Sequence, residues 1–113
     1  MAPGEICLSY FPFGAGGGMK LRPVLLLTGP IGAVPEVLAA YISSVVPPVL
    51  LPSDLILDPA APDCATTNLK SASILRLHKL ATIHQRSVVR LLGHISTTVQ
   101  SDVDVKLRRL MGL

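Results

Sequence analysis

The feature that most constrains the fold is a short apolar run, Val24–Leu27, held between two groups of chain-breaking residues. Glycines precede the run, and Gly29-Pro30 closes it. Four apolar residues are too few for a helix, and a short run bounded by turn residues is typical of a buried strand. Because Pro23 fixes its own φ and keeps Arg22 out of the α region, we expect Arg22 to lie extended at the first step of this strand.

Two interpretations of Arg22 are open at this point. A cation at the mouth of a strand, beside flexible glycines, is placed to face an anion. The alternative is a solvated basic residue that flanks a core strand. The glycine-rich segment Gly14–Met19 is also open to two interpretations, a hairpin connection or a loop that gates a substrate. It lacks the Gly-Lys-Ser/Thr ending of a phosphate-binding P-loop.

Further short apolar runs alternate with turn residues along the chain, which is typical of a sheet of many short strands. We expect strands over residues 4–11, 36–44, 54–57, 73–83 and 87–95, and a proline-rich loop over residues 58–68. Ser96 is placed to cap a C-terminal helix whose apolar face holds Val99, Val103, Leu107 and Leu110. The pattern predicts a mainly β or α+β fold, a small SH3-like β-barrel with a C-terminal helix, as a single domain over residues 1–113.

The composition is that of a globular protein, with half of the residues hydrophobic and 15% charged. The most apolar segment, Val37–Leu51, is shorter than the roughly 20 residues that a membrane-spanning helix needs, and Pro47-Pro48 breaks it. No basic stretch precedes an apolar one at the N-terminus, so we expect no signal peptide, no membrane contact and a cytoplasmic location. A mean hydropathy of +0.56 then suggests a buried subunit interface.

The charge is unevenly distributed along the chain. Eight of the ten basic residues follow residue 69, namely Lys70, Arg76, Lys79, Arg86, Arg90, Lys106, Arg108 and Arg109. A basic half favours an anionic partner, either nucleic acid or an acidic protein segment. An exposed basic edge that discourages strand pairing is the alternative for Arg76 and Lys79. The three histidines and two cysteines share no metal-ligand spacing, so we expect no metal and no cofactor.

Several motifs together carry a resemblance to a known family. A strand opens with Pro-Gly-Glu-Ile, a Phe-Pro-Phe segment follows, and the glycine-rich loop leads into Lys-Leu-Arg-Pro and an aliphatic strand. A short strand then ends in two serines. These segments are Pro3–Ile6, Phe11–Phe13, Lys20–Pro23, Ala40–Ser44, Asn68–Lys70 and Leu92–Ser96. In order and spacing they resemble the PemK/MazF family of toxin ribonucleases over nearly the whole chain.

The resemblance implies a homodimeric toxin of a type II toxin–antitoxin system. It implies a metal-independent endoribonuclease that cleaves single-stranded RNA (mRNA) and is silenced by a cognate acidic antitoxin. Arg22 takes the place of the catalytic cation of the family, and Ser43 the place of its catalytic threonine. Serine keeps the hydroxyl but lacks the methyl group that fixes the rotamer of threonine, so we expect reduced activity.

The chemistry is consistent with these positions. RNA supplies its own nucleophile, the 2′-OH, and a guanidinium offers a rigid fork of donors to the phosphate under attack. Arginine stays protonated and is a poor general base, so we assign Arg22 to charge stabilisation and acid catalysis. The base remains open among solvent, a relay through Ser43 and a group not identified. The candidate RNA-binding residues are Lys20, Ser44, Arg76, His78 and Lys79.

Two other functions remain open. One is a non-enzymatic poison on the same fold, like the CcdB gyrase inhibitors, which acts by binding a protein or DNA. The other is a catalytically inactive homologue that only binds an acidic partner or regulates its own promoter. The Arg22-Pro23 strand and the hydroxyl at Ser43 favour the ribonuclease.

Overall fold

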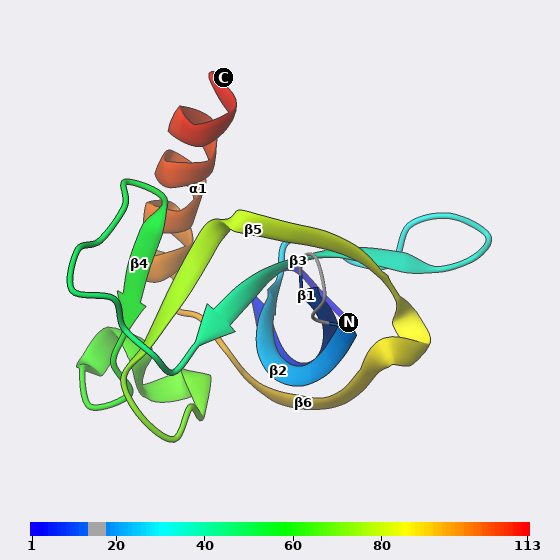
Figure 1. Cartoon of the computed structure of the whole chain (residues 1–113), viewed down its shortest axis with the longest axis horizontal. Coiled ribbons are helices and arrows are strands. Elements are labelled where there is room, and N and C mark those ends of the chain that lie inside the picture. Colours follow the sequence, from blue (N-terminus) through cyan, green and yellow to red (C-terminus); the bar gives the residue numbers. More distant parts are fainter. Residues whose placement is uncertain (14–17) are drawn as a thin grey trace.

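The computed structural model describes residues 1–13 and 18–113, in which six strands precede a C-terminal α-helix (Figure 1). The strands are β1 (Glu5–Phe13), β2 (Gly18–Leu26), β3 (Glu36–Ser43), β4 (Asp54–Leu57), β5 (Ser73–His84) and β6 (Val88–His94). The helix α1 spans Thr97–Met111, and the short 3-10 helices η1 (Pro62–Thr67) and η2 (Gln85–Ser87) flank β5. None of the helices described is long and apolar enough to cross a membrane.

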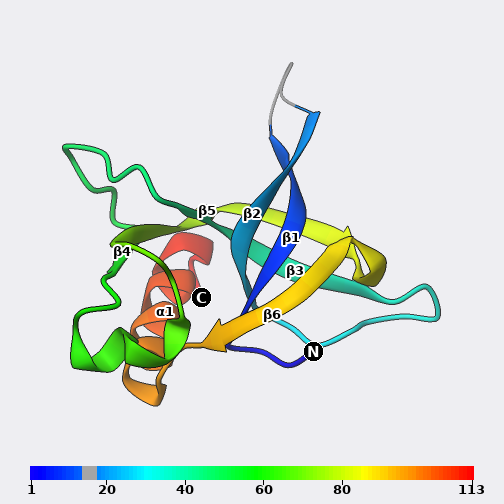
Figure 2. The same ribbon diagram turned by 90° about the horizontal axis from the view of Figure 1, so that it is seen from below.

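The six strands form one sheet in the order β4-β5-β3-β2-β1-β6, and every pairing is antiparallel. The sheet curls on itself in Figure 1, and the β1–β2 hairpin projects from it in Figure 2. Within the described residues β4 and β6 are edge strands that do not pair with each other, so the curled sheet stays open. The predicted SH3-like architecture with a C-terminal helix is confirmed, with an open sheet in place of a closed barrel.

Two apolar clusters lie on opposite faces of the sheet because successive side chains of a strand point to opposite sides. The helix-side cluster comprises Ile6, Leu25, Ala40, Ile42, Leu57, Cys64, Leu69, Leu75, Leu77, Ile95, Val99 and Val103. The opposite cluster comprises Cys7, Phe11, Val24, Leu26, Val37, Ala39 and Ile83. Both clusters receive side chains from β1, β2, β3 and β5. The face to which each side chain of these strands points is therefore determined by the core.

The C-terminal helix begins where the sequence predicted. The Ser96 side chain accepts a hydrogen bond from the backbone N–H of Val99 at 3.2 Å, and Gly112 ends the helix in the left-handed conformation. Val99 and Val103 are buried against the sheet. Leu110 was expected on the same face but is 44% exposed, because the last turn extends past the sheet.

The sequence prediction was wrong at two loops. The first hairpin is longer than expected, since β1 includes Pro12 and β2 starts at Gly18. Proline is tolerated there because β6 pairs with β1 only as far as Ser9, so the missing N–H leaves no ladder bond broken. The proline-rich stretch expected as a loop contains η1, which ends at Asn68 in the left-handed conformation, φ 55°. The remainder of the predicted glycine loop, residues 14–17, lies outside the described residues.

Candidate active site

Arg22 and Ser43 lie where the β2–β3 ladder ends. The last pair of that ladder is Val24↔Tyr41, and Arg22 and Ser43 each lie two residues beyond it on their own strands. Side chains two residues apart share a face of a strand, so both lie on the face of the opposite cluster, with Val24 and Tyr41. The two residues predicted to be catalytic therefore follow the last β2–β3 pair on the same face of the sheet, one on each strand.

The local geometry leaves both side chains accessible. Arg22 is exposed on β2, and its Nη1 donates to the backbone oxygen of Leu21 at 2.9 Å. The half-buried Ser43 accepts a hydrogen bond at Oγ from the backbone N–H of Val45 at 3.1 Å, so a tight turn ends β3. Lys20 lies two residues nearer the hairpin tip on the same face as Arg22 and is also exposed.

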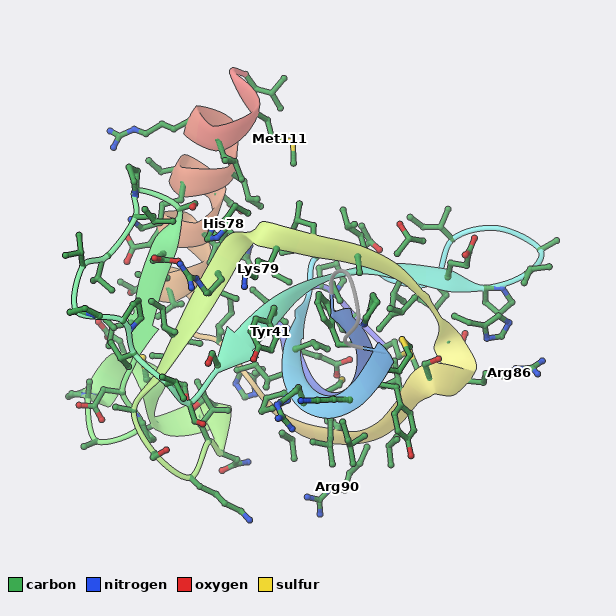
Figure 3. The ribbon with its side chains drawn as sticks, viewed as in Figure 1. Tyr41, His78, Lys79, Arg86, Arg90 and Met111 are labelled. Atoms are coloured by element: carbon green, nitrogen blue, oxygen red, sulfur yellow. The ribbon has the colours of Figure 1, made fainter. Side chains whose placement is uncertain are left out.

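A cation lies next to an aromatic pair on this face. The rings of Phe11 and Tyr41 stack with centroids 5.5 Å apart and an interplanar angle of 26°. Lys79 Nζ lies 5.7 Å from the centroid of the Tyr41 ring, and the two side chains point toward each other in Figure 3. Such a contact holds the ammonium near the surface of the sheet and contributes about 0.5–1 kcal/mol at an exposed site.

A bulge in β5 explains why two candidate RNA-binding residues are exposed. Ala40 pairs with Leu80, but the next residue of β3, Tyr41, pairs with Arg76, so three residues of β5 have no partner on β3. These residues are Leu77, His78 and Lys79. The Leu77 backbone N–H donates to Ser53 O at 3.0 Å instead, while the side chains of His78 and Lys79 turn outward. Bulges of this kind re-aim side chains and are enriched beside functional sites.

Arg76 is held by a buried carboxylate. Its Nε lies 3.0 Å and its Nη2 3.4 Å from the two carboxylate oxygens of Asp54, whose side chain is fully buried. Asp54 Oδ2 also accepts a hydrogen bond from the Leu51 backbone N–H at 2.8 Å. The pair joins β4 to β5, so the first contribution of Arg76 is to hold the sheet edge beside Tyr41.

His78 belongs to the same polar group. Its Nδ1 lies 2.7 Å from Ser53 Oγ and 3.9 Å from Asp54 Oδ1. These contacts hold the ring through Nδ1, and the residue is exposed on the bulge. Across residues 1–13 and 18–113 no three His, Cys, Asp or Glu side chains gather in a way that could hold a metal ion.

Ser44 does not lie with the other candidates. It follows the end of β3, is exposed, and lines a separate groove on the other side of β2 together with Pro23. Since Pro23 alternates with Arg22 along the strand, the groove and Arg22 lie on opposite faces of β2.

The two cysteines are buried thiols. Cys7 is 2% and Cys64 5% exposed, and neither forms a disulfide. Burial is the main reason that the pKa of each thiol is raised above its ordinary value, with the Glu5 carboxylate adding to the effect at Cys7. Both thiols are therefore poor nucleophiles.

Sequence reasoning missed the partners that organise the site. Asp54 was assigned only to a short strand, and Ser53 and the Phe11–Tyr41 stack were not identified. Each of these contacts crosses between strands that are distant in the sequence, and it depends on the register and on the β5 bulge. The sequence shows an acid at the start of one predicted strand and an arginine within another, but it does not determine that Asp54 and Arg76 pair with each other.

The structure resembles solved toxins and ribonucleases. The Mycobacterium tuberculosis toxin MazF-mt6 matches with a TM-score of 0.74 and 20% identity, covering 96% of this chain and 97% of that one. An endoribonuclease from a mycobacterial species, solved in complex with its cognate antitoxin, matches with a TM-score of 0.69 and 14% identity over 100% and 96% of the two chains. MazF from Deinococcus radiodurans matches with a TM-score of 0.68 and 19% identity over 99% and 96%. At these identities the likeness shows the fold.

The sequence itself assigns the family. No curated protein sequence matches the chain significantly. The model of the PemK-like, MazF-like toxins of type II toxin–antitoxin systems matches residues 2–111. The match spans all the strands and the C-terminal helix, including the elements that carry Arg22 and Ser43. The chain therefore belongs to the PemK/MazF family of toxins.

Proposed function

We propose that this toxin is a metal-independent endoribonuclease that cleaves single-stranded mRNA in the cytoplasm. The observation that supports the proposal is the end of the β2–β3 ladder at Val24↔Tyr41, beyond which the exposed Arg22 and the half-buried Ser43 follow on the same face of their two strands. A guanidinium and a hydroxyl on one accessible face suit a phosphodiester, which offers several oxygen acceptors to such donors.

In the proposed reaction the 2′-OH of the substrate attacks the adjacent phosphorus while the bond from phosphorus to the 5′-oxygen breaks. The 2′-OH gives up its proton to a base, and the departing 5′-oxygen takes up a proton. The products are a 2′,3′-cyclic phosphate and a 5′-hydroxyl. Arg22 stabilises the negative charge that grows on the phosphate oxygens and supplies the acid side of the reaction, and Ser43 donates to the phosphate or orients the 2′-OH. Removing a comparable donor costs other enzymes about 2.7–4 kcal/mol in transition-state stabilisation.

The remaining candidates are proposed to hold the RNA on either side of the cut. Lys20 extends the cationic face toward the hairpin tip, and Lys79 extends it along β5 beside Tyr41. His78 offers the ring nitrogen that does not contact Ser53. Arg76 contributes mainly through its ion pair with Asp54, which holds β4 against β5.

The partners follow from the family and from the surface. A structural relative is an endoribonuclease in complex with its cognate antitoxin, which supports an acidic antitoxin as the partner of this chain. A homodimer is supported by apolar side chains that the single chain leaves exposed on the β3–β4 loop and the end of α1, namely Val45, Val46, Val49, Leu50, Leu51, Leu110, Met111 and Leu113.

The test is the Arg22→Ala variant, with Arg86→Ala as a matched control. Arg86 is an exposed arginine on η2, far along β5 from the site (Figure 3). Arg22→Ala should lower kcat for single-stranded RNA in EDTA by a factor of about 100–1,000 or more, because one charge-stabilising group is lost. Arg86→Ala should cleave at the wild-type rate.

Circular dichroism and sedimentation should show that both variants keep the fold and oligomeric state of the wild type. Undiminished cleavage by a folded Arg22→Ala variant would remove Arg22 from the mechanism. RNA or gyrase binding without cleavage by the wild type would instead favour an inactive homologue or a non-enzymatic poison.

A further inference from the structure

A groove of about 470 Å³ lies on the face of β2 opposite Arg22. It is bounded by the turn after β3, the segment between η1 and β5, and strands β1, β2 and β6. Its lining residues are Leu8, Pro23, Ser44, Asn68, Leu69, Lys70, Ser71, Ser73, Arg90 and Leu92. The volume falls in the range of about 300–1,000 Å³ that is typical of small-ligand sites.

Two cations converge on this groove from different elements. Lys70 follows η1, Arg90 comes from β6, and both are exposed. Among the described residues no carboxylate lies within ion-pairing distance of either one, and none lines the groove. Two cations without a protein counter-ion, over a floor that includes Leu8, Leu69 and Leu92, suit an anion that also carries an apolar part.

The walls of the groove are held in place. The Asn68 side chain donates to the backbone oxygen of Leu92 at 2.7 Å, which ties the segment after η1 to β6. Gly93 packs so closely on η1 that a Cβ there would lie 2.3 Å from the Thr66 backbone oxygen. The two cations are thus carried on elements that contact each other directly, so the backbone that bears them is already in place before binding.

The groove adjoins the proposed cutting site. Pro23 lines the groove and Arg22 precedes it on the other face of β2, while Ser44 lines the groove and Ser43 precedes it at the end of β3. The β2–β3 ladder has already ended at Val24↔Tyr41, so the two strands no longer bond to each other at this point. A strand of RNA held at Arg22 and Ser43 can therefore continue past the end of β3 into the groove.

We propose that this groove binds a nucleotide of the RNA substrate that flanks the cut. Lys70 and Arg90 contact its phosphates, the aliphatic floor packs against the base and sugar, and Ser44 and Ser71 offer hydroxyls to their polar edges. The assignment rests on the proposed ribonuclease function. RNA is favoured over an acidic peptide because the groove joins the proposed cutting site at both Pro23 and Ser44.

The experiment measures binding of a fluorescein-labelled, fully 2′-O-methylated hexanucleotide, which cannot cleave itself, by fluorescence anisotropy over a series of salt concentrations. The variant is Lys70→Gln/Arg90→Gln, and Arg86→Gln is the control for loss of an exposed arginine outside the groove (Figure 3). The double variant should bind about 10-fold more weakly. Its log–log salt slope should be shallower by about 1.4, since each phosphate contact on single-stranded nucleic acid contributes about 0.7.

Cleavage of unmodified RNA gives the second readout. The double variant should raise KM and leave kcat near the wild-type value, because Lys70 and Arg90 contact flanking phosphates and not the reacting one. Wild-type affinity in the double variant, or a fall in kcat at unchanged KM, would overturn the assignment. So would loss of polyglutamate binding with RNA binding intact, which would assign the groove to an acidic protein. A wild type that binds the hexanucleotide through this groove but cleaves no RNA would remove the nuclease function and leave the groove assignment standing.

Discussion

At the scale of single residues, the candidate site depends on the alternation of side chains along β2 and β3. Arg22 and Pro23 point to opposite faces of β2, while Ser44, in the turn after β3, lines the groove on the Pro23 side. The sequence predicted the extended backbone at Arg22 from Pro23 alone. It did not predict that Ser43 follows the β2–β3 ladder on the same face as Arg22, because that depends on the register of two strands that are joined through a turn-rich connection.

Ser43 allows a direct test of the hydroxyl. Ser43→Ala should lower kcat at least 10-fold, because the group that donates to the phosphate or orients the 2′-OH is lost. Ser43→Thr should raise kcat several-fold, since the added methyl group restricts the side-chain rotamer while the hydroxyl remains. Rates on single-stranded RNA in EDTA check both variants. Ser43→Ala activity equal to that of the wild type would exclude the hydroxyl from the reaction.

The buried thiols predict a dependence of stability on pH. An exposed thiol titrates at about 8.5, and burial raises the pKa of Cys7 and Cys64 in the folded state. The unfolded chain therefore releases these protons first as the pH rises. The stabilisation is complete below the unfolded pKa and is lost progressively as the pH rises toward the folded pKa.

Urea unfolding at pH 7 and at pH 9.5 measures this effect. The wild type should lose more free energy of unfolding between the two pH values than the Cys7→Ala/Cys64→Ala variant does, because only the wild type carries the thiols. Equal losses in the two proteins would show that the thiols are not shielded in the folded state.

At the scale of elements, the sequence predicted most strands and the helix but missed what joins them. The limits of β4 and the cap of α1 were predicted because alternation, turn residues and a capping serine are local signals. The β5 bulge at residues 77–79 has no such signal. It lies directly beyond Arg76, the last residue of this stretch of β5 that pairs with both β3 and β4, and it re-aims His78 and Lys79.

The Asp54–Arg76 pair is expected to stabilise the β4–β5 edge. Asp54→Ala removes a fully buried carboxylate and leaves Arg76 and the Leu51 backbone N–H without their acceptor. We expect the free energy of unfolding to fall by about 3 kcal/mol, as for other broken buried pairs. Asp102→Ala, on an exposed position of α1, should change it by less than about 0.5 kcal/mol. Urea unfolding checks both variants, and equal stabilities would show that the buried pair contributes little.

At the scale of the whole molecule, cations gather on both faces of β2. Lys20, Arg22 and Lys79 belong to the face of the opposite cluster, while Lys70 and Arg90 border the groove behind it. The sequence predicted a basic second half of the chain and an anionic partner. It did not predict which of these cations lie close together in the folded protein. The sheet order brings β2 beside both β1 and β3, and this topology gathers the cations around one hairpin.

The central claim is that this toxin cuts RNA without a metal ion, and the wild-type protein in EDTA tests it most directly. Purified protein is incubated with single-stranded RNA in excess EDTA, and the ends of the products are identified by mass spectrometry. We expect internal cleavage that leaves a 2′,3′-cyclic phosphate and a 5′-hydroxyl. RNA that is bound but stays intact, or that is cut only when a divalent metal is restored, would contradict the claim.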